Sequence, residues 1–253
     1  LKEKGWLDKT IFHIADEPSN HNVISYRKVS EFIHRYAPSI IRGEAIEAVN
    51  FFNRLEVWIA KLNLLNTWFD VYKEAQKEGY ELWHYVCMHP TNAYPNRFID
   101  FSVIKPRLLS WINYRYDISG FLQWGFNYWS EDPFTIMNEP VYGPGDMWIV
   151  YPKKDGLLSS IRWEQKRNGI QDYEYFWLLE NKIPRAYQSG YHDNNLLKNT
   201  QMFVGWQYLK PHKAIKSLKW VKQVYFLLCS RAILNSWQKA TRGKYPGYFF
   251  PII

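Results

Sequence analysis

Residues 10–18 read Thr10-Ile11-Phe12-His13-Ile14-Ala15-Asp16-Glu17-Pro18, a short apolar run that ends in two carboxylates and a proline. Such a run, bounded by a proline, predicts a strand over residues 10–15. Neighbouring side chains of a regular strand point to opposite faces, so Asp16 and Glu17 can address one site only if the strand ends there. Pro18 favours that end because it restricts the backbone of the residue before it. The stretch therefore predicts a strand that brings two carboxylic acids to one edge of a sheet.

Outward from this stretch, strand-like runs alternate with helical stretches along residues 1–194, the pattern of parallel strands joined by crossovers. Further strands are expected over 40–48, 81–88, 120–125 and 147–151, with a short apolar run at 57–65. Helices are expected over 23–36, 68–78, 106–116, 159–168 and 170–181. The first helix is expected to bury one face, made of Val29, Phe32, Ile33 and Tyr36.

These elements predict an α/β fold of the (β/α)8 barrel type, in which polar and aromatic residues gather after the strand ends. In such a barrel the carboxyl ends of the strands form the active-site face. The sequence supplies only about five strands, whereas a closed barrel has eight. We therefore expect an incomplete barrel over residues 1–194.

The composition excludes a disordered chain, because 47% of the 253 residues are hydrophobic and 19% are aromatic. The net charge of +8 is uneven: residues 1–194 carry a charge of −2, and residues 195–253 carry +10 with no acidic residue. Residues 195–253 are expected to form a basic, partly helical tail. Such a helix could contact a membrane, an acidic partner or nucleic acid, but the simpler interpretation is a packed helix with a solvated lysine face. We expect no nucleic-acid partner and no membrane contact.

Adjacent carboxylates at a strand end suit glycoside hydrolysis, in which one acid protonates the leaving oxygen and a second group manages charge at the sugar carbon. Taken alone, Asp16 and Glu17 are more often a cap or a solvated turn. Aromatic residues strengthen the glycosidase hypothesis, since rings with a polar edge form platforms for sugars. For Trp124 and Trp129 the sugar-platform and core interpretations are evenly balanced, whereas Trp83 and Trp148 are expected in the core.

Other chemistries lack a motif. His13 and His84 are expected to be hydrogen-bonded core histidines, and Cys87 and Cys229 have no metal-ligand spacing. No HExxH, CxxC, GxGxxG, GxxxxGK[ST] or GxSxG motif is present. We therefore expect neither a metal nor a cofactor.

Several ordered motifs resemble glycoside hydrolase family 123, and together they cover roughly residues 5–183. They are Phe12-His13-Ile14-Ala15-Asp16-Glu17-Pro18, Tyr85-Val86-Cys87-Met88-His89-Pro90, Pro95-Asn96-Arg97-Phe98-Ile99-Asp100, residues 120–129, Gly145-Asp146 with Val150-Tyr151-Pro152, residues 160–164 and residues 169–174. The resemblance implies a β-N-acetylgalactosaminidase built as a β-sandwich followed by a (β/α)8 barrel.

The resemblance also implies substrate-assisted retaining catalysis, in which the sugar's own 2-acetamido oxygen attacks the anomeric carbon and no enzyme nucleophile is needed. Asp16 would then orient the acetamido group, and Glu17 would be the general acid and later the base, a role that burial favours. Tyr85, Arg97, Trp124, Asn127 and Trp129 match positions that line the site. The expected partner is a glycan with terminal β-linked N-acetylgalactosamine.

Two departures from the family pattern shape the expectation. The Asp-Glu pair should follow about the fourth barrel strand, so the sequence from Leu1 onward is expected to hold the barrel from that strand. Residues 195–253 show no family pattern. The alternative function is a non-catalytic carbohydrate-binding protein or an inactive fragment of such an enzyme. Family members are often exported, although no signal peptide is visible before Gly5.

Overall fold

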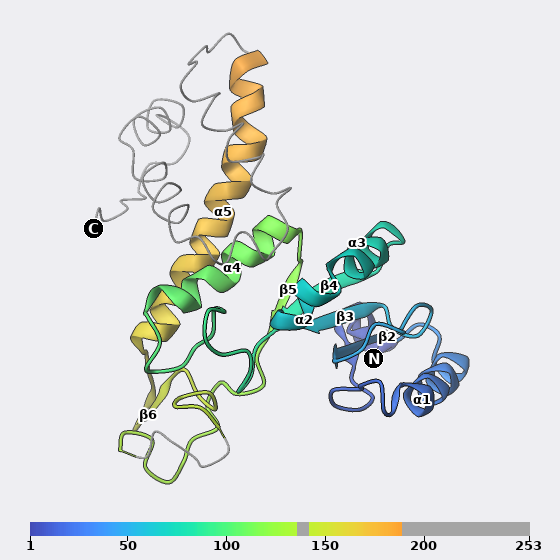
Figure 1. The fold of residues 1–253 in the computed structure, drawn as a ribbon, viewed down its shortest axis with the longest axis horizontal. Coiled ribbons are helices and arrows are strands. Elements are labelled where there is room, and N and C mark those ends of the chain that lie inside the picture. Colours follow the sequence, from blue (N-terminus) through green and yellow to red (C-terminus); the bar gives the residue numbers. More distant parts are fainter. Residues whose placement is uncertain (136–141, 189–253) are drawn as a thin grey trace. The chain divides into compact units, whose positions relative to one another are not determined.

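A computed structural model describes residues 1–135 and 142–188, and residues 1–178 form one compact unit. Two short 3₁₀ helices, Lys2–Lys4 and Leu7–Lys9, precede the first strand. The remaining elements alternate largely as predicted (Figure 1). In chain order they are β1 (Ile11–Phe12), α1 (Val23–Tyr36), β2 (Ile41–Ile46), β3 (Val57–Lys61), α2 (Leu62–Thr67), α3 (Phe69–Lys77), β4 (Glu81–Tyr85), α4 (Ile104–Tyr116), β5 (Gly120–Leu122), β6 (Tyr151–Lys153), β7 (Gly156–Leu158) and α5 (Ile161–Gln188).

Strands β1 to β5 form one parallel sheet in which the spatial order is the chain order. The register pairs Ile46 with Ala60, His84 with Phe121 and Tyr85 with Leu122. A sheet wound in one direction, with each crossover returning to the next strand, is the arrangement of part of a β/α barrel rather than of a doubly wound sheet. The predicted α/β class is therefore confirmed, with five parallel strands.

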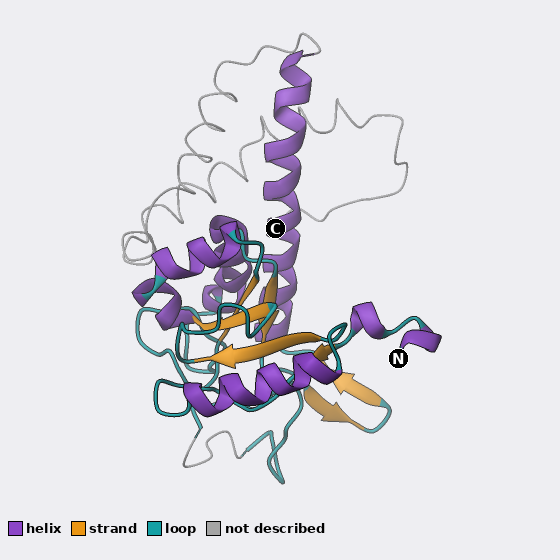
Figure 2. Ribbon diagram, turned by 90° about the vertical axis from the view of Figure 1, so that its right-hand side faces the viewer, coloured by secondary structure: helices purple, strands orange, loops and turns teal. Residues whose placement is uncertain are grey.

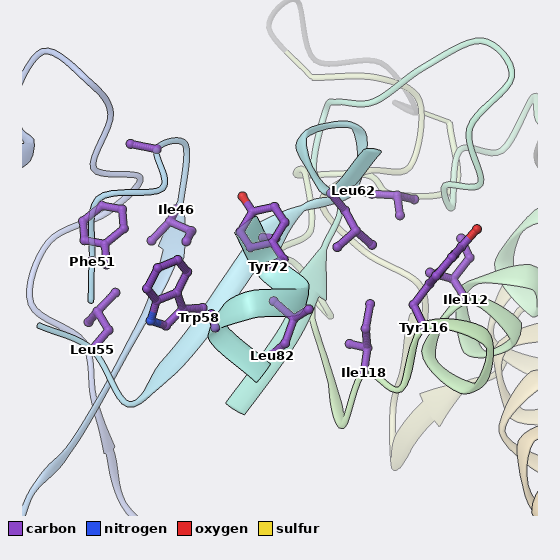
Figure 3. Close-up of a cluster of buried hydrophobic side chains, with 14 of the residues drawn as sticks. Ile46, Phe51, Leu55, Trp58, Leu62, Tyr72, Leu82, Ile112, Tyr116 and Ile118 are labelled. Atoms are coloured by element: carbon purple, nitrogen blue, oxygen red, sulfur yellow. The ribbon is translucent and has the colours of Figure 1, made fainter. Parts of the chain in front are cut away.

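The two faces of the sheet differ, because alternate residues of each strand point to opposite sides. One face packs against α1 to α4 through a large apolar cluster centred on Trp58 and Tyr72 (Figure 3). The other face carries a smaller layer made of Ala45, Val57, Ile59 and Tyr85. Figure 2 shows helices (purple) running alongside the strands of the parallel sheet (orange). Helices α1 to α4 thus cover one face, and the other face corresponds to a barrel interior.

The segment after β5 departs from the prediction. Residues 147–150 do not join the parallel sheet; Trp148 makes only an isolated bridge with Asn127, and the antiparallel hairpin β6–β7 follows. The two helices predicted over 159–181 are one helix, α5. The helix continues through Gly169, whose lack of a side chain allows α4 to approach: a Cβ atom there would come within 2.4 Å of the Arg107 carbonyl oxygen.

Helix α1 has the predicted bounds, but its expected buried face is wrong. Val29, Phe32 and Tyr36 are exposed, and the buried residues are Val23, Tyr26 and Ser30. Polar contacts to the sheet fix this orientation: the Tyr26 hydroxyl donates to Glu44, and Ser30 binds the backbone of Arg54 and the Arg42 guanidinium.

The predicted tail of residues 195–253 lies outside the described residues, as does Cys229. Within the described part of the chain, no helix has the length and hydrophobicity needed to span a membrane.

Candidate active site

The bend after β1 carries the two predicted acids. Asp16 is exposed and adjoins Glu17, whose backbone has a positive φ of 46°. Few side-chain-bearing residues adopt this left-handed conformation, and those that do cluster at functional sites. The strand itself is shorter than predicted, because β1 ends at Phe12, but the backbone does turn at Glu17, directly before Pro18.

The carboxylate of Glu44, in β2, binds the backbone just before this bend. The Glu44 Oε2 atom accepts the backbone N–H groups of Ile14 and Ala15, each at 3.0 Å, and the Tyr26 hydroxyl at 3.1 Å. Burial raises the pKa of Glu44, whereas the Ala15 amide and the His13 ring oppose that rise. His13 Nδ1 lies 2.5 Å from Glu44 Oε1, with its side chain about half exposed. His13 thus lies at ion-pair distance from a buried carboxylate, and the prediction that it is a core residue is wrong.

Glu17 lies at the carboxyl ends of β3 and β4. The Tyr85 hydroxyl donates to Glu17 Oε1 at 2.5 Å, and Lys61 Nζ lies 3.1 Å from the same oxygen. The Lys61 ammonium also contacts the Glu47 carboxylate directly. The last residues of two neighbouring strands thus hold the carboxylate delivered by the bend after β1.

Burial and charge set the protonation of the groups around Glu17. Burial, reinforced by the Glu17 carboxylate, strongly raises the pKa of Tyr85, so this phenol remains a hydrogen-bond donor. Burial alone would lower the pKa of Lys61, but Glu47 and Glu17 raise it overall and keep the ammonium charged. The Glu17 side chain is 34% exposed, so it lacks the burial expected for a general acid.

A second group of side chains lies in the loop after β5. The Trp124 ring, 41% exposed, donates from Nε1 to Asp146 Oδ2 at 3.1 Å and lies beside Tyr128 and Tyr142. Burial raises the pKa of Asp146, and the Trp124 hydrogen bond opposes that rise. The exposed ring is thereby held by a buried carboxylate, an arrangement that favours the platform interpretation of Trp124.

The other two predicted residues of this loop have different environments. Asn127 is exposed and its backbone bridges to Trp148. Trp129 is half-buried and donates from Nε1 to the Val150 carbonyl at 2.8 Å. Trp148 is buried, as predicted for a core residue.

Arg97 lies beneath the loops and is only 3% exposed. Its Nη2 atom donates to the carbonyls of Gly125 at 2.8 Å and Asp146 at 3.1 Å. Burial lowers the pKa of Arg97 to about 9, although the nearby Asp146 carboxylate opposes this. Arg162 of α5 in turn donates to the carbonyls of Arg97, Gly145 and Trp148. Arg97 is thus part of a buried guanidinium network that ties three segments together.

The structure brings Glu17 and Tyr85 into direct contact, and it places Trp124, Asn127 and Trp129 in one loop. Cys87 follows β4, and its thiol interacts electrostatically with Lys61, Glu17 and Asp146. Cys87 is a free thiol, and burial raises its pKa.

Sequence reasoning missed Lys61, Glu47 and Asp146. Lys61 is the last residue of β3, and Glu47 directly follows β2. Both occupy the odd-numbered positions that point to the interior face, as Ala45, Val57 and Ile59 do. The period-two alternation of each strand, continued to its carboxyl end, was the signal that could have found them.

His84 is confirmed as a core histidine. It is buried, and its Nε2 atom lies 2.8 Å from Asn113 Oδ1. Burial, with the Lys166 charge, lowers its pKa to about 3, so it is neutral. Among residues 1–135 and 142–188, no cluster of three or more His, Cys, Asp or Glu side chains is arranged to hold a metal ion.

Comparisons with known proteins agree with the motif resemblance. Residues 1–179 match the family model described as "Glycoside hydrolase 123, catalytic domain". A solved structure of a family 123 glycoside hydrolase from Clostridium perfringens, studied for glycolipid glycan hydrolysis, has a similar fold with a TM-score of 0.60 and 22% sequence identity. The match covers 74% of this chain and 34% of that one, so this chain spans about a third of that protein's length. No curated protein sequence matches. Because the family model covers more than two thirds of its length, this chain belongs to glycoside hydrolase family 123.

Proposed function

We propose that this chain carries the acid–base half of a glycosidase site that releases terminal β-linked N-acetylgalactosamine by substrate-assisted retaining catalysis. The contact between Glu17 and the Tyr85 hydroxyl at 2.5 Å, on the active-site edge of a parallel sheet, carries this proposal. It fixes a partly exposed carboxyl group where a glycosidic oxygen can reach it.

In the first step the acetamido oxygen of the substrate attacks the anomeric carbon while the C1–O bond breaks. Glu17 gives its proton to the leaving oxygen, and a cyclic oxazolinium forms. Asp16, the neighbour of Glu17 in the same bend, orients the acetamido N–H and stabilises the developing positive charge. In the second step water attacks C1, the ring opens, and the Glu17 carboxylate takes the proton from that water.

The aromatic loop provides the sugar platform in this proposal. Trp124 offers an exposed face, and the Asp146 carboxylate fixes its ring edge. Asn127 and Trp129 lie in the same loop and contribute to the binding surface. Arg97 acts indirectly, because its guanidinium binds the Gly125 and Asp146 carbonyls on either side of this platform.

Hydrolysis of a chromogenic β-N-acetylgalactosaminide tests the proposal, beside the β-N-acetylglucosaminide and the unacetylated β-galactoside. Glu17→Gln should lower kcat at neutral pH by at least about 100-fold, the usual contribution of general acid–base catalysis. Glu81→Gln is the matched control, since Glu81 begins β4 at the opposite edge of the sheet. Wild-type turnover by Glu17→Gln would contradict the proposal.

A fluorinated substrate series tests the substrate-assisted step separately. Replacing the acetamido methyl hydrogens with one, two and three fluorines withdraws electrons from the amide oxygen, so kcat/KM should fall steadily along the series. An unchanged kcat/KM would exclude the acetamido oxygen as nucleophile. Saturable binding of N-acetylhexosamines without cleavage would instead support the second candidate, a carbohydrate-binding protein, which the five-strand sheet favours.

A further inference from the structure

We propose that Lys61, held by Glu47, is a positioning residue that fixes the Glu17 carboxylate and sets the pH range over which Glu17 carries a proton. This inference rests on the proposed role of Glu17 as the general acid. It assigns a function to a buried cation that contacts the reacting acid and that the mechanism above does not use.

Contacts and burial single out Lys61. Its side chain is 9% exposed, and its ammonium lies 3.1 Å from Glu17 Oε1 and in direct contact with Glu47. The same ammonium lies 5.5 Å from the centre of the Tyr85 ring. A lysine is rarely buried to this extent without charged partners, and here both partners are carboxylates at the active-site edge.

The groups that face Glu17 come from three neighbouring segments. They are Glu47 after β2, Lys61 at the end of β3, Tyr85 at the end of β4 and Cys87 just beyond it. Tyr85 and Cys87 are neutral in the neutral pH range, because burial raises the pKa of each. Lys61 and Glu47 therefore supply the charge that Glu17 experiences from these segments, in addition to that of Asp16, its neighbour in the bend after β1.

These two charges act on Glu17 in opposite directions. A cation beside a carboxyl group favours its ionised form and makes it a stronger acid. Glu47 neutralises part of that cation, so it favours the protonated form of Glu17. The backbone N–H of Glu47 also donates to the Pro18 carbonyl at 3.0 Å, which links the Lys61 partner to the bend that carries Glu17. The Lys61–Glu47 ion pair thus contacts the bend twice, through the Lys61 side chain at Glu17 and through the Glu47 backbone at Pro18.

The pH dependence of kcat/KM on the N-acetylgalactosaminide tests this inference in the full chain. In Lys61→Met the limb on which activity falls with rising pH should move up by about one to three pH units, the range for a carboxyl group beside a cation. In Glu47→Gln the same limb should move to lower pH, by a smaller amount than the rise expected in Lys61→Met. Lys61→Arg keeps the charge and should leave the limb near its wild-type position, and Lys77→Met, an exposed lysine of α3, is the control.

A purely structural role predicts a different result. If each of Lys61→Met and Glu47→Gln lowers kcat/KM by the same factor at every pH, so that the limb does not move, the inference is overturned. Should Lys61→Met fail to fold, the displacement in Glu47→Gln alone decides the outcome.

A titration that needs no turnover separates this inference from the proposed function. In protein labelled with ¹³C at glutamate carboxyl groups, the Glu17 signal, assigned through Glu17→Gln, should titrate at higher pH in Lys61→Met than in the wild type. Coincident titrations would refute the inference. If the wild-type chain cleaves no glycoside, the proposed function is refuted. If the Glu17 titration is nevertheless displaced in Lys61→Met relative to the wild type, the effect of the Lys61 charge on Glu17 is still established.

Discussion

Lys166 of α5 is a buried cation, and replacing it with methionine is expected to stabilise the protein. The Lys166 side chain is 8% exposed, and its ammonium lies 3.6 Å from the centre of the Phe121 ring. Burial, and then the positive charge of Arg97, lower the pKa of Lys166 from 10.5 to about 7. A folded-state pKa below the unfolded value means that stability is fully present above pH 10.5 and is lost as the pH falls toward 7.

The size of this effect follows from the shift in pKa. At 1.36 kcal/mol per unit, burying Lys166 costs about 4 kcal/mol at pH 7. The contact with the Phe121 ring returns about 2 kcal/mol of that cost. Methionine has a similar length and fills irregular apolar space, so Lys166→Met should gain about 2 kcal/mol of unfolding free energy at pH 7. As the pH rises the lysine loses its charge, so the burial cost falls and the contact with Phe121 weakens with it; the gain should therefore shrink by about 1 kcal/mol between pH 7 and pH 9.

Urea unfolding followed by tryptophan fluorescence at pH 7 and pH 9 measures both quantities. Lys77→Met, which removes an exposed lysine, should change the unfolding free energy little and equally at both pH values. A Lys166→Met variant less stable than the wild type at pH 7, or a gain of equal size at both pH values, would refute the reasoning.

Three further substitutions test the supports of the site. Glu44→Gln removes the charge that holds the bend before Asp16, so kcat should fall at least about tenfold, with a stability loss of about 1–3 kcal/mol in urea unfolding. Asp172→Ala removes the carboxylate that accepts hydrogen bonds from Arg107 and Trp111 of α4, and should cost about 3 kcal/mol, measured as a lower Tm. Gly125→Ala places a Cβ atom 2.5 Å from the Met147 carbonyl oxygen, so the loop that carries the sugar platform must shift and KM should rise with stability reduced by about 1–3 kcal/mol. Unchanged kcat, Tm or KM, respectively, would contradict each prediction.

Sequence reasoning located most elements because their signals are local. Pro38 follows helix α1 and the left-handed Gly79 follows α3, so the ends of both helices could be placed from neighbouring residues. Strand β4 was recognisable because most of residues 81–88 are apolar. The sheet order then follows from the alternation of strands and helices.

The orientation of α1 could not be predicted, because it depends on partners distant in sequence. The apolar stripe of Val29, Phe32 and Tyr36 suggested one face, but contacts between Tyr26 and Glu44, and between Ser30 and Arg42, turn the helix the other way. Periodicity counts hydrophobic residues and takes no account of such polar contacts.

The residues of the candidate site also divide into those with a local sequence signal and those placed by contacts between distant parts of the chain. Asp16 and Glu17 could be found because two acids and a proline interrupt a strand, and Tyr85 because it ends the clearest strand. Asp146 could not be found as the support of Trp124, since 22 residues separate them and only the folded loop brings them together.

The positive φ of Glu17 places the stability of the protein in conflict with its chemistry. Asparagine and glycine occupy the left-handed region more readily than glutamate does, so either residue at position 17 would relax the bend while removing the acid. Repeated rounds of selection for thermal stability alone would therefore be expected to replace this glutamate early. Selection for turnover would retain it, and the dense anchoring by Glu44, Tyr85 and Lys61 is what allows the chain to tolerate it.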